Sequence, residues 1–147
     1  EMFCASRSEG AWFVTSGGKH PIACSNTLSI KAMRSLVSRS RTLYPVARAH
    51  KTLGISIIYR RGSAGFKCSR IAIGDAELWL LDPNRVSLWD LCASEILLTE
   101  AGGMLTDHEG KPIDYTIEGT KWPRGMIASS SKTLHPQIVR RVGHLLQ

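Results

Sequence analysis

The stretch WDLCASEILLTEAGG occupies residues 89–103 and decides the fold of the chain. Asp90 opens an apolar run, and a carboxylate suits the first turn of a helix, where it meets free backbone N–H groups and the positive end of the dipole. Gly102 and Gly103 end the run and favour the left-handed conformation in which many helices terminate. We therefore predict a largely buried helix over residues 89–103, followed by a short strand over residues 104–107.

The rest of the chain alternates between strand and helix patterns. The run ISIIY at residues 55–59 is continuously apolar, which is typical of a buried strand. The alternation predicts a single α/β domain, with a mostly parallel or mixed sheet flanked by helices on both faces. The further predicted elements are a hairpin of strands 11–15 and 21–25, strands 35–38, 76–81 and 126–129, and helices 42–53, 63–73 and 134–146.

The charge balance favours anionic partners. The 147 residues include 19 Lys and Arg against 12 Asp and Glu, a formal net charge of +7. Such an excess suits phosphorylated metabolites or nucleic acid. Apart from clusters at Arg34, Arg39 and Arg41 and at Arg60 and Arg61, the basic residues are scattered. No aromatic platform is interleaved with them, so we do not expect nucleic acid as a partner.

Composition also bounds the class of protein. A hydrophobic content of 43% is ordinary for a globular domain, and no apolar run approaches the roughly 18 residues of a membrane span. The four cysteines follow no CxxC or zinc-like spacing, which favours reduced thiols in a cytoplasmic protein. The N-terminus shows no apolar signal core and no initiator methionine, so we expect a processed chain or a piece of a longer one.

Histidine-based chemistry is not indicated by the sequence. The histidines show no HExxH motif and no i, i+4 pair, and no Ser-His-Asp, Cys-His or GxGxxG arrangement stands out. We therefore interpret all five as surface or capping residues: His20, His50, His108, His135 and His144.

Three motifs, taken in order, carry a resemblance to a known family. They are SEGAWF at residues 8–13, GSAGFKCSRIAIGDAELWL at residues 62–80, and the WD and EAGG elements within residues 89–103. This combination resembles the inositol monophosphatase family, which includes the 3′(2′),5′-bisphosphate nucleotidases and other Mg²⁺-dependent phosphomonoesterases. The resemblance spans nearly the whole chain and implies the C-terminal half of a layered α/β/α/β/α sandwich.

The resemblance makes Asp90 a metal ligand and catalytic residue, and Trp89 a packing residue. Taken alone, Asp90 would be only a helix cap and Trp89 only core. Hydrolysis of a phosphate ester with Mg²⁺ needs several carboxylates around the cation. The family supplies the others from a Glu-bearing segment and a DPxDGT loop, and neither occurs here, where the one DP pair is Asp82-Pro83. We therefore expect that the N-terminal metal-binding half is absent and that the chain is inactive alone, with Asp75 and Glu77 in structural roles.

The turn before the second predicted helix is a candidate substrate site. Gly62, Ser63 and Ala64 are small residues that leave backbone N–H groups free for an anion at the start of a helix. The resemblance places this turn in the substrate pocket, and it matches Lys67 to a lysine that holds nucleotide in the nucleotidase branch. Without the resemblance, Ser63 would be a helix cap and Lys67 a solvated surface lysine.

A second candidate segment resembles the SRSH sequence of the nucleotidase branch. Ser38 and Arg39 stand in this segment, with Arg41 in place of the histidine, and such side chains suit phosphate or ribose oxygens. A solvated loop would explain them equally well. Leu81 occupies the position at which inositol phosphatases carry glutamate and nucleotidases carry arginine, so it does not discriminate between the two.

We predict a Mg²⁺-dependent phosphomonoesterase acting on a small phosphorylated metabolite, and favour a bisphosphate nucleotidase because of Ser38, Arg39 and Lys67. The alternatives are an inositol-1-monophosphatase and a non-catalytic nucleic-acid or protein-binding module derived from this fold. The expected polypeptide partner is the missing N-terminal half or a second copy of the chain, and no membrane is expected as a partner.

Overall fold

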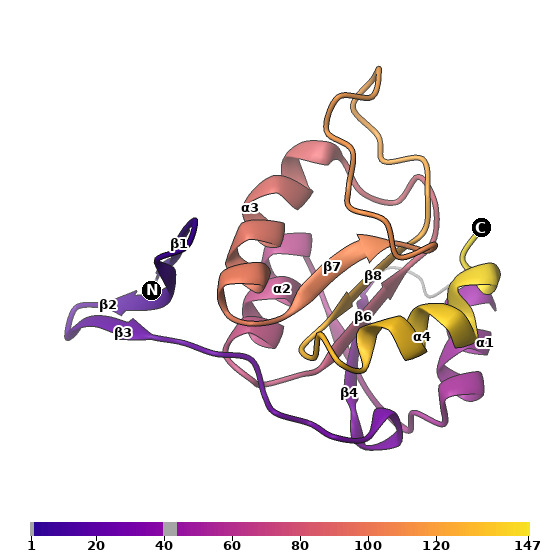
Figure 1. Ribbon diagram of the computed structural model, residues 1–147, viewed down its shortest axis with the longest axis horizontal. Helices are drawn as coiled ribbons and strands as arrows, with labels where there is room; N and C mark the ends of the chain where they lie inside the picture. Colours follow the sequence, from indigo (N-terminus) through magenta and orange to yellow (C-terminus); the bar gives the residue numbers. More distant parts are fainter. Residues whose placement is uncertain (1, 40–43) are drawn as a thin grey trace.

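The computed structural model describes residues 2–39 and 44–147 (Figure 1). Ser40 and Arg41 therefore lie outside the described residues. The strands are β1 (Met2–Ser6), β2 (Gly10–Thr15), β3 (Gly18–Pro21), β4 (Arg34–Ser38), β5 (Ile57–Arg61), β6 (Leu78–Leu81), β7 (Met104–Asp107) and β8 (Met126–Ser129). The α-helices are α1 (Tyr44–Leu53), α2 (Ala64–Ala72), α3 (Leu88–Glu100) and α4 (His135–Val142), and short 3-10 turns cover Ile30–Ala32 and Gly143–Leu145.

The central sheet is mixed, as the sequence predicted. Over the described residues its order is β5-β4-β6-β8-β7, with β4 parallel to β5 and β6, and β8 antiparallel to β6 and β7. Strand β6 lies at its centre and is buried on both faces. Leu78 and Leu80 pack with α1 and α4, while Trp79 and Leu81 pack with α2 and α3. The alternation of side chains along a strand thus feeds two separate cores.

The molecule is layered. Figure 1 shows α1 and α4 on one side of the central sheet and α2 and α3 on the other, with the sheet β1-β2-β3 beyond α2 and α3. This outer sheet packs on the helices where Ala11 of β2 meets Ala72 of α2, Leu97 of α3, and Ala101 just after α3. The order of layers is therefore sheet, helices, sheet, helices, which confirms the predicted α/β class.

Helix α3 confirms the helix predicted for residues 89–103, but it is less buried than predicted. Its N-cap is Ser87, Asp90 lies in the first turn, and Gly102 takes a positive φ of 95° after the helix ends. However, Trp89 is 63% exposed, so it is not a packing residue among the described parts of the chain. Cys92 and Ala93 are exposed on the same side. The outer sheet contacts the C-terminal half of α3 at Leu97, contacts Ala101 just after the helix, and leaves this side of the first turns of α3 uncovered.

Two strand predictions need correction. The run at residues 55–59 is not a buried strand: β5 begins at Ile57 and lies at the edge of the sheet, where Ile57, Ile58 and Tyr59 are each about two-fifths exposed. An apolar run cannot by itself reveal whether a neighbouring layer covers it. The hairpin at residues 11–25 is tighter than predicted, because β3 already ends at Pro21, and β1 was not predicted.

The prediction that all five histidines are surface or capping residues is wrong for two of them. His50 of α1 is buried, and its Nε2 shares a hydrogen bond with Ser35 Oγ of β4 at 2.7 Å. His135 of α4 is buried between Ser129 Oγ at 2.7 Å and Thr106 Oγ1 at 2.9 Å. The imidazole of His50 therefore connects α1 to the central sheet, and the imidazole of His135 connects α4 to it.

Two structural findings concern the helices and the cysteines of the described residues. Among residues 2–39 and 44–147, no helix combines the length and the apolar character needed to cross a bilayer. In the same residues, each of the four cysteines is a free thiol, in line with the spacing of the cysteines in the sequence. The cytoplasmic location stays a prediction.

Candidate functional site

A polar pocket lies at the carboxyl ends of the parallel strands. Ser38 ends β4, Leu81 ends β6, and Arg61 of β5 pairs in register with Ser38. Helices α2 and α3 both begin at this edge, after residues 62–63 and 82–87 respectively. Carboxyl ends of parallel strands and helix N-termini are where α/β proteins commonly bind anionic ligands, because free N–H groups and positive dipole ends converge there.

The pocket has a volume of about 230 Å³, and side chains from β4, α2, β6 and α3 share its walls. Five of the seven predicted site residues line it, although they come from three separate segments of the chain. The lining residues are Ser38, Ser63, Ala64, Lys67, Trp79, Leu81, Arg85, Val86 and Asp90.

The turn before α2 is strained, and its Ser63 carbonyl accepts a hydrogen bond from Lys67 in the wall of the pocket. Ser63 has a φ of 52°, a conformation that non-glycine residues rarely adopt, and its hydroxyl makes no capping bond. Lys67 Nζ instead donates to the Ser63 carbonyl at 2.9 Å and lies 4.6 Å from the ring centre of Trp79. Lys67 is only 3% exposed, so it is not a surface lysine, and burial lowers the pKa of its amine.

Asp90 combines a helix-terminal role with an exposed carboxylate. Its Oδ2 accepts a hydrogen bond of 3.4 Å from the backbone N–H of Ser87, and its own N–H donates to the Ser87 carbonyl at 3.0 Å. The side chain remains exposed and lines the pocket. This geometry is compatible with both sequence interpretations, a helix-terminal contact and a ligand for a cation.

The two remaining predicted residues flank the pocket without lining it. Gly62 precedes Ser63 in the turn, and Arg39 follows Ser38 with an exposed side chain. Arg41 was predicted beside them and lies outside the described residues.

Sequence reasoning missed Trp79, Arg85 and Val86 in the pocket walls. Trp79 is buried, and its indole N–H has no hydrogen-bond partner among the described residues. Arg85 lies on the turn between β6 and α3, where no motif marks it. A pattern search cannot detect it, because only the folded turn directs it to the pocket.

The carboxylates of this part of the chain do not make a complete metal site. Mg²⁺ takes near-octahedral oxygen coordination from carboxylates, phosphates and water. Asp90 is the one carboxylate that lines the pocket, and residues 2–39 and 44–147 contain no cluster of three or more His, Cys, Asp or Glu suited to a metal. Glu77 is engaged elsewhere, since it accepts the Arg34 backbone N–H at 2.7 Å and the Ser25 hydroxyl at 2.9 Å, which supports its predicted structural role.

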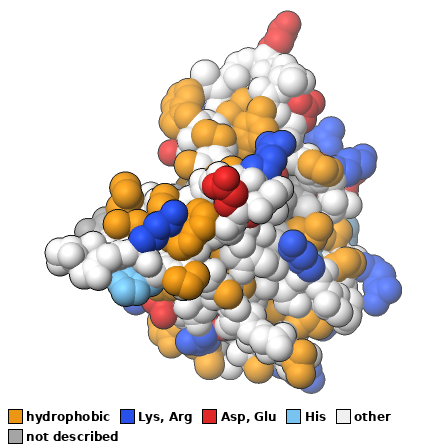
Figure 2. Space-filling view, turned by 60° about the vertical axis from the view of Figure 1, so that its left-hand side comes forward, with side chains coloured by type: hydrophobic (Ala, Val, Ile, Leu, Met, Phe, Trp, Pro, Cys, Tyr) orange, Lys and Arg blue, Asp and Glu red, His pale blue; other side chains and the backbone are white. Residues whose placement is uncertain are grey.

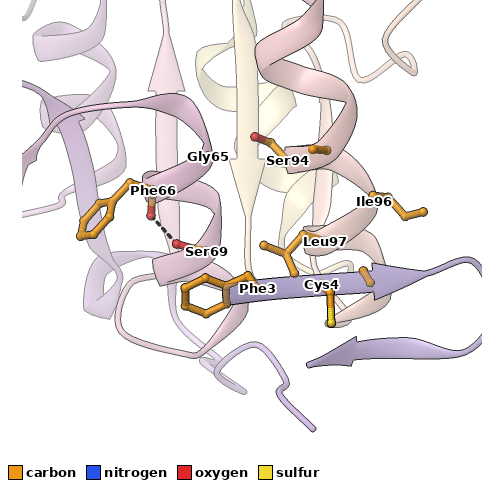
Figure 3. Close-up of a pocket in the computed structure, with 10 residues that line it drawn as sticks. Phe3, Cys4, Gly65, Phe66, Ser69, Ser94, Ile96 and Leu97 are labelled. Carbon is orange, nitrogen blue, oxygen red and sulfur yellow. Dashed lines mark hydrogen bonds between the residues drawn. The ribbon is translucent and has the colours of Figure 1, made fainter. Parts of the chain in front are cut away.

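A second, larger cavity lies between β1 and helices α2 and α3. It measures about 490 Å³, and its walls include Phe3 and Cys4 of β1, Phe66 of α2, and Ile96 and Leu97 of α3 (Figure 3). Its two hydroxyls bond to backbone carbonyls of their own helices: Ser69 to Phe66 and Ser94 to Asp90, at 2.9 and 2.7 Å. The cavity therefore offers apolar surface and little free polar chemistry.

Comparisons with known proteins agree on one family. The model of the "Inositol monophosphatase family" matches residues 1–147. The chain is 28% identical to "Probable 3′(2′),5′-bisphosphate nucleotidase 4" of Arabidopsis thaliana, over 96% of this chain and 43% of that protein. It is also 28% identical to the human "Golgi-resident adenosine 3′,5′-bisphosphate 3′-phosphatase", over 92% of this chain and 38% of that protein.

Solved structures show the same fold. The inositol monophosphatase from Anabaena (Nostoc) sp. PCC 7120 matches with a TM-score of 0.73 and 21% identity, over 97% of this chain and 54% of that one. The chain thus spans about half the length of this solved structure and about two-fifths of the length of the two curated relatives. Because the family model covers every residue, the chain belongs to the inositol monophosphatase family.

Proposed function

We propose that this chain forms the substrate-side half of a Mg²⁺-dependent phosphomonoesterase acting on a small phosphorylated metabolite. One observation supports this most: Ser38, Ser63, Ala64, Lys67 and Asp90 meet in one pocket at the carboxyl ends of parallel strands. That edge also receives the N-termini of α2 and α3, which favour a phosphate group.

Each residue then has a defined task. The start of α2 and the amine of Lys67 bind the phosphate, and the hydroxyls of Ser38 and Ser63 orient it by hydrogen bonds. Asp90 is one ligand of a cation site whose remaining ligands come from outside the described residues. The family is generally metal-dependent, and Mg²⁺ is the cation proposed here because carboxylate and phosphate oxygens are the ligands that it prefers.

We favour a bisphosphate nucleotidase as the finer function. The curated relatives named above carry nucleotidase and 3′-phosphatase names, and Lys67 is drawn into the pocket rather than to the surface. Leu81 is apolar and lines the pocket, so the end of β6 offers neither a side-chain acceptor for the hydroxyls of a polyol nor a cation for a second phosphate, and it favours neither substrate. An inositol-1-monophosphatase is the alternative.

We also propose that the complementary half of the enzyme covers the apolar groove between β1, α2 and α3. Figure 2 shows apolar side chains gathered around the hairpin of β2 and β3. Phe66, which lines the groove, is 41% exposed, and Trp89, outside the groove in the first turn of α3, is 63% exposed. The solved family members have about as many residues again as this chain. The surface that covers the groove is therefore the complementary half of the family's fold or, failing that, a second copy of the chain.

Sedimentation of the purified 147 residues tests the covering of the groove. Self-association, or a monomer that binds a dye specific for hydrophobic surface, supports it. A monomer at high concentration that binds no such dye contradicts it.

The activity itself is tested by phosphate release. The longest natural form that contains these residues should release phosphate from adenosine 3′,5′-bisphosphate or from inositol monophosphates, and only when Mg²⁺ is present. No Mg²⁺-dependent release from any of these substrates would refute the proposed function.

One observation favours a second candidate, a non-catalytic module that binds nucleic acid or a protein. The described residues lack a cluster of ligating carboxylates, while the chain keeps a net charge of +7. A module of this kind would bind oligonucleotides with a steep dependence on salt, and Asp90→Ala would not change the affinity. Weak binding that resembles that of any basic protein would exclude it.

A further inference from the structure

The turn that carries Arg85 is held rigidly by a distant segment of the chain. The backbone N–H of Asn84 donates to the carbonyl of Trp122 at 3.0 Å, and the N–H of Trp122 donates to the carbonyl of Val86 at 3.0 Å. Asn84 adopts a left-handed φ of 60°, which turns the chain sharply just before Arg85. Trp122 is buried, so these two hydrogen bonds connect the turn to a residue of the hydrophobic core. The backbone of Arg85 is therefore held beside the pocket.

The guanidinium of Arg85 is available to a ligand. Within the described ranges it forms no salt bridge, although the acidic residue Asp82 is only three positions away. Asp82 is buried, and burial raises the pKa of its carboxyl, with the charge of Arg85 acting in the opposite direction. The side chain of Arg85 is exposed while it lines the pocket. The guanidinium of Arg85 therefore faces the pocket and solvent and forms no ion pair with a described residue.

Two cations enter the pocket from different elements. Lys67 comes from α2, and Arg85 comes from the turn before α3, against one carboxylate, Asp90. A single phosphate ester carries a charge of about −2 at neutral pH, and a bisphosphate carries roughly twice that. Arginine also holds phosphate through a planar pair of N–H donors, which a lysine cannot do.

We propose that Arg85 binds the second phosphate of a bisphosphate substrate and makes the pocket prefer bisphosphates to monoesters. This rests on the proposed function and deepens it. Leu81, at the end of β6, is apolar and offers no donor to an anion, whereas Arg85 on the following turn offers a guanidinium. The phosphate to be cleaved lies toward Asp90 and Lys67, and the second phosphate lies toward Arg85.

The test is calorimetric binding to the longest natural form that contains these residues, in EDTA so that no hydrolysis occurs. The probes are adenosine 3′,5′-bisphosphate and adenosine 3′-monophosphate. We expect the native protein to bind the bisphosphate at least about tenfold more tightly, the value of one charged hydrogen-bonded contact. Arg85→Gln should remove this preference, Arg85→Lys should retain part of it, and Arg140→Gln on α4 should leave it unchanged. Thermal unfolding of each variant verifies that it is folded.

Each outcome decides between the two proposals. A bisphosphate preference that survives Arg85→Gln, or the absence of any preference or binding in the native protein, overturns the role of Arg85. Phosphate release that occurs without an Arg85-dependent preference leaves the proposed function intact. An Arg85-dependent preference without any phosphate release supports the second-phosphate site and refutes the phosphatase.

Discussion

The two buried histidines should make the folded chain sensitive to mild acid. His50 and His135 each bond to hydroxyls of the central sheet, and burial lowers the pKa of each imidazole to about 4, from an ordinary value near 6.5. The folded protein therefore holds both rings neutral where the unfolded chain would protonate them. Their contribution to stability is complete above about pH 6.5 and is lost as the pH falls toward 4.

The size of the effect follows from the pKa difference. Between these pH values the unfolded chain binds one more proton per histidine than the folded chain does. For each histidine, the free energy of unfolding therefore falls by about 1.4 kcal/mol for every unit by which the pH is lowered. By pH 5 the loss is about 2 kcal/mol for each ring and about 4 kcal/mol for both. Against a typical stability of about 5–15 kcal/mol, this is a large fraction.

Urea unfolding near pH 7.5 and pH 5 measures the loss, with His50→Gln, His135→Gln and the double variant as comparisons. The variants are expected to be less stable at neutral pH, since they disturb the buried hydrogen bonds, but each single change should remove about half of the excess acid sensitivity. Carboxylates such as Glu77 contribute equally to native protein and variants, so only the difference between them is used. An equal loss of stability in the native protein and the double variant would refute the assignment.

Three further predictions concern single positions. Glu77→Gln should cost about 2 kcal/mol in urea unfolding, because the buried carboxylate pairs with the half-solvated Arg34; an unchanged midpoint would contradict this. Gly103→Ala should lower the melting temperature, because a Cβ would lie 2.7 Å from the Ser129 carbonyl oxygen and 2.6 Å from Leu98 Cδ1; a stable alanine variant would show that this contact can relax. Asp90→Ala should cost at most about 1 kcal/mol of stability, the usual value of a helix-terminal contact; a larger loss would mean that the carboxylate supports the core.

The sequence predicts most of the framework because its signals are local. The apolar run ended by a glycine pair predicts α3 and β7, and the turn at Gly62 and Ser63 predicts the start of α2. The starts and ends of these elements depend on residues that are close together in the chain. The grouping of Ser38, Lys67 and Asp90, which lie in three separate segments, was predicted only through the resemblance to the family.

Other features depend on contacts between distant segments and so were not predictable. The exposure of β5 and of Trp89 depends on which layer covers an apolar surface, and the apolar pattern is the same whether or not the layer is there. The burial of His50 depends on the side of α1 that meets the sheet. The turn that carries Arg85 is held by backbone hydrogen bonds to Trp122, which lies far along the chain.

The central claim is that Asp90 belongs to a phosphate-ester site, and one measurement tests it most directly. Mg²⁺-dependent phosphate release from adenosine 3′,5′-bisphosphate is compared between Asp90→Asn and the native protein, each in the longest natural form. Asparagine keeps the size of the side chain but removes the negative charge, so the rate should fall by at least about 100-fold while the unfolding free energy changes little. Full activity of Asp90→Asn would contradict the claim and leave Asp90 as a helix-terminal residue alone.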